Sequence, residues 1–130
     1  MVLLRNEAKS GIGFQLDWAC FYPDFIMWIK GADKTWMVFI DPKGLQYTKG
    51  LEDERVEFIN EGIKEIERKL NQDIFLHAFI LSETKYKDII KRIKKEKILS
   101  QQDYENKKIL FLEEDGWCKK LFERLIDESS

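Results

Sequence analysis

Residues 22–43 read YPDFIMWIKGADKTWMVFIDPK, and this stretch decides the fold. Its two halves, residues 22–30 and 35–41, are rich in aromatic and β-branched side chains, which favour extended strands. The residues between them, Gly-Ala-Asp-Lys at 31–34, make a hairpin loop of common length. We therefore expect an antiparallel hairpin in which Lys30 lies opposite Thr35.

The chain after this hairpin alternates between helical and extended patterns. A helix is predicted over residues 52–70 because apolar side chains recur there at steps of three and four, at Val56, Ile59, Ile63, Ile66 and Leu70. Residues 74–81 and 108–112 predict strands. Each of these strands precedes a helix, the first capped by Ser82 and the second by Asp115. The inner face of the last helix is expected to consist of Trp117, Leu121, Phe122 and Leu125.

The order of these elements predicts an α/β fold. A short strand within residues 13–18 precedes the hairpin, and strand-helix-strand crossovers follow it, which join parallel strands. We expect a mixed central sheet, with an antiparallel hairpin plus parallel crossover strands, flanked by helices. Residues 1–130 are long enough for one domain, which could be the C-terminal fragment of a larger enzyme.

Composition excludes several classes of protein. No apolar run approaches the roughly 20 residues of a membrane span, and no signal-peptide pattern opens the chain, so we expect a cytoplasmic protein. One histidine and two separated cysteines offer almost no zinc ligands, so a metal would be held by carboxylates, which suit Mg²⁺ or Mn²⁺. The net charge of -2 argues against a free-standing protein that coats nucleic acid. It permits a catalytic module that another domain delivers to DNA.

The expected hairpin brings two acids together. Counting back along both strands places Asp24 opposite Asp41, with Cβ atoms about 5 Å apart. Two carboxylates at that spacing repel by roughly 3 kcal/mol at an effective dielectric of 20, and a divalent cation between them would remove the repulsion. Lys43 lies two residues after Asp41 and so points to the same face. The alternatives are that both acids are ordinary residues at strand ends, or that a bulge shifts the register.

These residues also resemble a known family. Tyr22-Pro23-Asp24-Phe25, followed by Val38-Phe39-Ile40-Asp41-Pro42-Lys43-Gly44, resembles the PD-(D/E)xK signature of restriction-endonuclease-like nucleases. The similarity is greatest to the nuclease domain of type III restriction subunits and related helicase-nucleases, and Arg5-Asn6 with Gly11-Ile12-Gly13-Phe14 is similar to the stretch before their first acid. It covers residues 5–50 strongly and the remainder by element order.

The resemblance implies a role for each residue of the motif. Asp24 and Asp41 would bind Mg²⁺, with Mn²⁺ as a substitute, together with the backbone carbonyl of Pro42. Lys43 would lie near the scissile phosphate and orient or activate the attacking water. Many members add an acid from a preceding helix, and only Glu7 is available for that role here.

Other residues are weaker candidates for contact with DNA: Gln46, Lys49, Lys91, Lys94 and Lys95. The basic run that contains the last three is also typical of a solvated helix face. We expect His77, in an apolar strand, to be a core histidine whose polar atoms are satisfied, and Trp28, Trp36 and Phe58 to belong to the core.

The leading hypothesis is a metal-dependent DNA endonuclease from a restriction or helicase-nuclease system, partnered by a helicase or ATPase domain or subunit. The alternative is a catalytically silent module of the same fold that binds DNA or a partner protein. The presence of all three motif residues, Asp24, Asp41 and Lys43, favours the enzyme. Oligomeric state stays open at this point.

Overall fold

The computed structural model describes residues 2–6, 14–15, 20–21, 23–43, 54–91 and 99–129. Its main sheet has five strands in the order β1-β4-β5-β6-β7. They are β1 (Val2–Arg5), β4 (Phe25–Lys30), β5 (Thr35–Lys43), β6 (Ile74–Ser82) and β7 (Ile109–Phe111). The first three pair antiparallel, and β6 and β7 continue the sheet in parallel. The predicted α/β fold with a mixed sheet is therefore confirmed.

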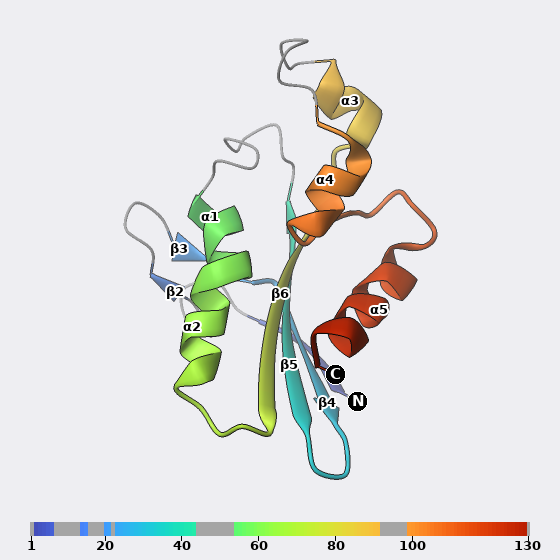
Figure 1. Cartoon of the computed structure of the whole chain (residues 1–130). Helices are drawn as coiled ribbons and strands as arrows, with labels where there is room; N and C mark the ends of the chain where they lie inside the picture. The colour runs from blue at the N-terminus through green and yellow to red at the C-terminus, as the bar shows by residue number, and fades with distance from the viewer. Residues whose placement is uncertain are drawn as a thin grey trace.

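Helices cover both faces of this sheet (Figure 1). On one side α1 (Glu54–Glu57), a π-helical segment η3 (Phe58–Gly62) and α2 (Ile63–Arg68) follow one another directly. On the other side lies α5 (Trp117–Ser129), while α3 (Tyr86–Ile90) and α4 (Gln101–Asn106) stand near the end where β6 finishes. A separate small sheet pairs β2 (Phe14–Gln15) with β3 (Cys20–Phe21). None of the described helices has the length and apolar character that a membrane span needs.

Two apolar cores lie on the two faces, because side chains along a strand alternate between faces. Ile26 and Phe39 belong to the core that packs against α1, η3 and α2, and their neighbours Met27 and Val38 belong to the core beneath α5. The expected inner face of α5 is confirmed, since Leu121 and Leu125 are buried there and Trp117 and Phe122 pack against them.

The π-helical turn has a local cause in Asn60. Its side-chain Nδ2 donates to the carbonyl of Val56 (2.9 Å), the acceptor that a regular α-helix would offer to the Asn60 backbone N–H. The same amide also donates to the carbonyl of Lys107 (2.8 Å) and ties the helix to the start of β7. Gly62 leaves room for Phe58, whose ring would lie 2.6 Å from a Cβ at that position.

Several expected boundaries were wrong. Ser82 stays in β6, where its hydroxyl bonds both ways with the backbone of Thr84, and α3 begins only at Tyr86. The last helix begins at Trp117, two residues after Asp115. Leu70 and Trp28 are exposed (42% and 41%) rather than buried. Neither β1 nor α4 was expected.

The last third of β6, Ile80–Ser82, pairs with β7. Along the earlier part of β6 no described strand lies on that side, and side chains form hydrogen bonds with its edge. Ile80 and Ser82 form backbone hydrogen bonds on the β7 side, and Leu76 turns the same way where β7 does not reach. Its N–H donates to Glu67 Oε2 (2.6 Å), and its carbonyl accepts from Lys64 Nζ (2.8 Å). Two side chains of α2 therefore form the hydrogen bonds with Leu76 that a neighbouring strand would otherwise form.

Replacing Glu67 by alanine should destabilise the protein by about 2 kcal/mol, because the buried N–H of Leu76 would lose its acceptor. Urea unfolding measures this change. Glu65→Ala is the matched control, since Glu65 is exposed on the same helix and makes the same change in helix propensity. Equal destabilisation by both variants would show that the contact with Leu76 contributes nothing.

Candidate functional site

The register of the β4–β5 hairpin determines where the two predicted acids lie. Lys30 pairs with Thr35, as expected, and the pairing continues to Phe25 opposite Ile40. The next position on each strand is Asp24 and Asp41. Asp24 occupies the bend that leads into β4, while Asp41 lies inside β5. The hairpin therefore brings both acids to one end of the same strand pair.

Alternation within β5 places Asp41 on one face of the sheet, and the same alternation continued past the start of β4 predicts that face for Asp24. Asp41 is two residues beyond Phe39, and Asp24 is two residues before Ile26, and both apolar partners lie in the core beside α1, η3 and α2. Their surroundings differ, however. Asp41 is only 2% exposed, whereas Asp24 is exposed at the surface.

The acids lie at the end of the sheet where its parallel strands finish. Asp41 pairs with Ile80 and Lys43 with Ser82, the last residue of β6. In sheets with parallel strands, ligands bind preferentially beyond these carboxyl ends. The backbone of Lys43 continues β5 past Asp41, while its side chain lies outside what the structure describes.

The donor groups at this end suit a hard cation. Two carboxylates and the Pro42 carbonyl are oxygen ligands, which Mg²⁺ and Mn²⁺ prefer. Among the residues that the structure describes, no three His, Cys, Asp or Glu side chains lie together as a ready-made metal cluster. A cation here would accordingly keep several waters, as Mg²⁺ usually does.

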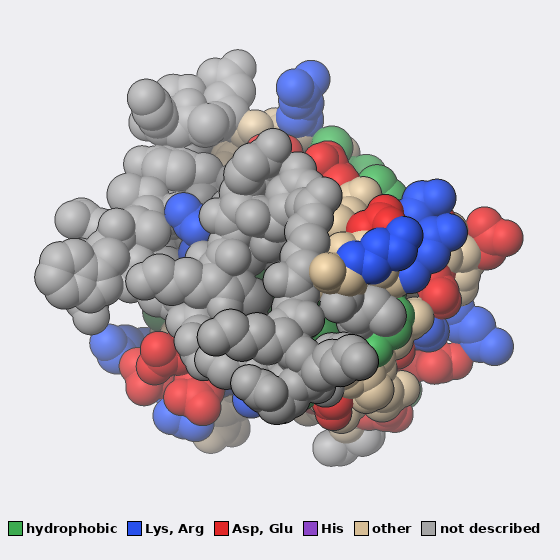
Figure 2. All heavy atoms as spheres, turned by 90° about the horizontal axis from the view of Figure 1, so that it is seen from above, with side chains coloured by type: hydrophobic (Ala, Val, Ile, Leu, Met, Phe, Trp, Pro, Cys, Tyr) green, Lys and Arg blue, Asp and Glu red, His purple; other side chains and the backbone are tan. Residues whose placement is uncertain are grey.

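Most of the weaker candidates fall outside the described residues: Glu7, Gln46, Lys49, Lys94 and Lys95. Lys91 is described, and its side chain is 73% exposed with its Nζ 3.8 Å from Asp88. Figure 2 views the molecule from the end where β5 and β6 finish, and basic and acidic side chains lie next to one another on its described part. The contact between Lys91 and Asp88 is typical of a solvated helix face.

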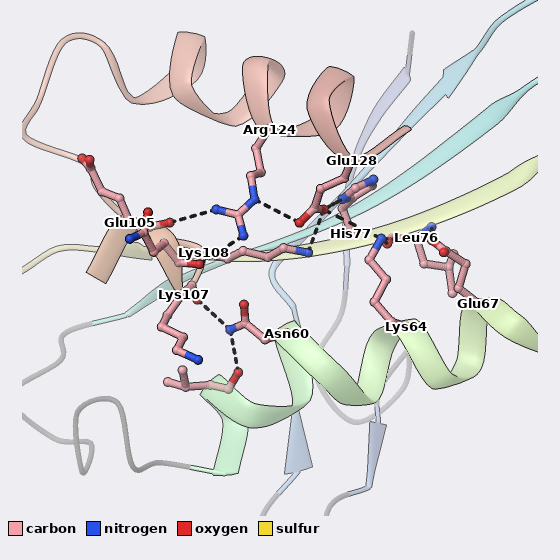
Figure 3. A network of polar contacts seen from close by, with 12 residues as sticks. Asn60, Lys64, Glu67, Leu76, His77, Glu105, Lys107, Lys108, Arg124 and Glu128 are labelled. Atoms are coloured by element: carbon pink, nitrogen blue, oxygen red, sulfur yellow. Dashed lines mark hydrogen bonds and ion pairs between the residues drawn. The ribbon is translucent and has the colours of Figure 1, made fainter. Parts of the chain in front are cut away.

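A second polar cluster lies at the other end of β6, where sequence reasoning had assigned a role only to His77 (Figure 3). His77 is fully buried, which confirms that it is a core histidine, and its Nδ1 lies 3.0 Å from Glu128 Oε2. The expectation that its polar atoms are all satisfied was wrong, because its Nε2 has no hydrogen-bond partner among the described residues. The same oxygen lies 3.3 Å from Nζ of Lys108, which is 2% exposed. Arg124 Nε donates to the other Glu128 oxygen (3.0 Å).

Burial changes the protonation of this cluster. It lowers the pKa of Lys108 to about 8, although Glu128 opposes the change, and it lowers the pKa of His77. Burial alone would raise the pKa of Glu128, but contact with His77 and the charges of Lys108 and Arg124 outweigh it and hold that pKa well below its usual range. The ammonium of Lys108 also lies 5.8 Å from the centre of the Phe79 ring. His77 and Lys108 are enclosed, whereas Glu128 and Arg124 are partly exposed, and their contacts join α5 to the sheet.

No protein-family model, curated protein or solved structure matches the chain. What the site can do therefore rests on its own geometry. That geometry consists of two acids at one end of a hairpin, with a lysine two residues after the second acid.

Proposed function

We propose that this chain is a magnesium-dependent DNA endonuclease domain whose reacting residues are Asp24, Asp41 and Lys43. The observation that supports the proposal is the hairpin register, in which the last pair is Phe25 with Ile40, so that Asp24 and Asp41 are the next residues beyond it. A register shifted by one residue would separate the acids onto opposite faces, because the side-chain period of a strand is two. The sequence motif and the strand pairing thus agree.

The two acids would contribute differently to metal binding, because Asp41 is buried and Asp24 is exposed. Asp41 is buried in the central strand β5, so its carboxylate is held in place by the sheet around it. Asp24 is exposed, so it faces the side from which a large substrate must approach. Together with the Pro42 carbonyl, they would hold the cation, which when bound supplies a Lewis acid that favours ionisation of a water.

The reaction in this proposal is hydrolysis of a phosphodiester bond in DNA. A water oxygen forms a new bond to phosphorus and gives up a proton, while the bond from phosphorus to the 3′ oxygen breaks. The products are a 5′ phosphate and a 3′ hydroxyl, which takes up a proton. The Lys43 ammonium would lie near the phosphate, where it offsets the negative charge that develops in the transition state.

The charge of the chain supports a partner in this reaction. With a net charge of -2, the domain offers few phosphate contacts of its own, and each contact contributes a slope of roughly 0.9 on the logarithmic salt scale. We propose that a helicase or ATPase domain or subunit, as in restriction and helicase-nuclease systems, supplies most of the affinity for DNA.

The test is incubation of closed circular plasmid with the purified chain and Mg²⁺ at low salt. Nicked and linear products are expected, with EDTA abolishing them, and Lys43→Ala should slow cleavage about a hundredfold. Lys30→Ala is the matched control, because Lys30 is an exposed lysine at the far end of the same hairpin. DNA that stays intact at high protein concentration would instead mean a silent module of this fold.

A further inference from the structure

One residue outside the motif, Asn6, holds the backbone around Asp24. Asn6 follows the last residue of β1, and its backbone N–H donates to the carbonyl of Asp24 (2.7 Å). Its side-chain Nδ2 donates to the carbonyl of the preceding residue, Pro23 (2.9 Å). Asn6 therefore binds two successive carbonyl groups of the bend that carries the first acid.

These two hydrogen bonds act on both sides of the Asp24 Cα. The carbonyl of Pro23 belongs to the peptide plane before Asp24, and the carbonyl of Asp24 belongs to the plane after it. Since peptide groups are planar, holding both planes restricts φ and ψ of Asp24 together. The direction of the Cα–Cβ bond is then set by the backbone, and only side-chain rotations stay free.

Asp24 needs such support more than Asp41 does. Asp41 is enclosed within β5, which pairs with β4 on one side and β6 on the other. Asp24 is exposed and precedes the first residue of β4, so ladder pairing of its own strand does not enclose it. Of the two residues adjacent to Asp24 in sequence, only Pro23 is buried, and Asn6 donates a hydrogen bond to its carbonyl.

We propose that Asn6 is a positioning residue that presents the Asp24 carboxylate to the metal ion. This inference rests on the proposed function of the site. Partners that orient a ligand, without touching the metal, typically raise metal affinity by 10- to 100-fold. Loss of the carboxamide should therefore weaken metal binding while the sheet, which keeps the backbone bond from Asn6 to Asp24, stays formed.

The test is a titration with Mn²⁺ alone, in which the free ion is measured by electron paramagnetic resonance. Asn6→Ala should weaken Mn²⁺ binding about tenfold and raise the Mg²⁺ concentration for half-maximal cleavage by the same factor. Asn71→Ala is the matched control, because Asn71 is exposed in the loop between α2 and β6. A purely structural role for Asn6 would change the urea midpoint but not the Mn²⁺ affinity of the folded protein.

Nuclear magnetic resonance of the natural sequence gives a second readout that does not depend on the folding of a variant. Substoichiometric Mn²⁺ should broaden the side-chain NH₂ signals of Asn6 together with the backbone amide of Asp24. Unchanged Mn²⁺ affinity in Asn6→Ala, or Asn6 signals that stay sharp while Asp24 broadens, would overturn this inference and leave the proposed function intact. Failure of the natural sequence to bind Mn²⁺ at all would overturn both.

Discussion

The Asp41→Asn variant is expected to cleave plasmid about a thousandfold more slowly than the natural chain, which is the upper range for losing one charge-stabilising group. Asp41 is 2% exposed, so no water-exposed side chain can readily take its place. Asparagine keeps the shape and one oxygen but removes the negative charge that a divalent cation requires. The measurement is the initial rate of plasmid nicking at saturating Mg²⁺.

Asp33→Asn is the matched control for this loss. It makes the same chemical change in the exposed loop at the other end of the hairpin, and it should leave the nicking rate unchanged. Asp24→Asn should lose cleavage like Asp41→Asn, yet change the free energy of unfolding by no more than about 0.5 kcal/mol, because Asp24 is exposed. Cleavage that persists in either variant would remove that acid from the site.

The largest effect on stability is expected from Glu128→Gln, which should cost about 3 kcal/mol at neutral pH. Glu128 faces the buried charge of Lys108 and the imidazole of His77 with a single oxygen, Oε2, at 3.3 and 3.0 Å. Lys64 from α2 approaches the same oxygen at 3.9 Å. Glutamine keeps the shape but leaves Lys108 enclosed without a counter-charge, so Lys108 must either lose its proton or bring in water.

This difference in stability should depend on pH with a definite sign. The pKa of Glu128 lies below its unfolded value of 4.5 because contact with His77 and the charges of Lys108 and Arg124 outweigh burial. Its contribution is therefore complete above about pH 4.5 and is lost as the pH falls further. The gap between the natural chain and Glu128→Gln should narrow between pH 6 and pH 3.5 in chemical denaturation.

Glu123→Gln provides the control on the same helix. Glu123 is 58% exposed and lies 3.9 Å from Lys119, so its loss should cost no more than about 0.5 kcal/mol. A cost of similar size for Glu128→Gln would mean that the cluster does not hold α5 against the sheet. A gap that stays constant down to pH 3.5 would exclude the Glu128 carboxylate as its source.

Local patterns were sufficient to predict the hairpin, the parallel crossovers and the inner face of α5. The pairing of Lys30 with Thr35 follows from the length of the loop between them, and the rest of the register follows residue by residue. This is why the last pair of the hairpin, Phe25 with Ile40, was predictable from sequence. The first residues of the helices were harder to predict. Ser82, for example, forms its hydrogen bonds with the backbone of Thr84 instead of capping a helix.

Tertiary structure alone decided which of the two acids is buried. Asp41 is enclosed because β5 is a central strand, while Asp24 precedes the pairing of β4 and stays exposed. The sequence alone does not distinguish Lys108 from the other lysines, because its burial beside Glu128 depends on α5 returning across β6. Such contacts join residues far apart in the chain, and no local periodicity encodes them. The amino-acid sequence thus predicted the hairpin with its register and the two later strands but not β1, and the packing of helices around the sheet determined the environment of each charge.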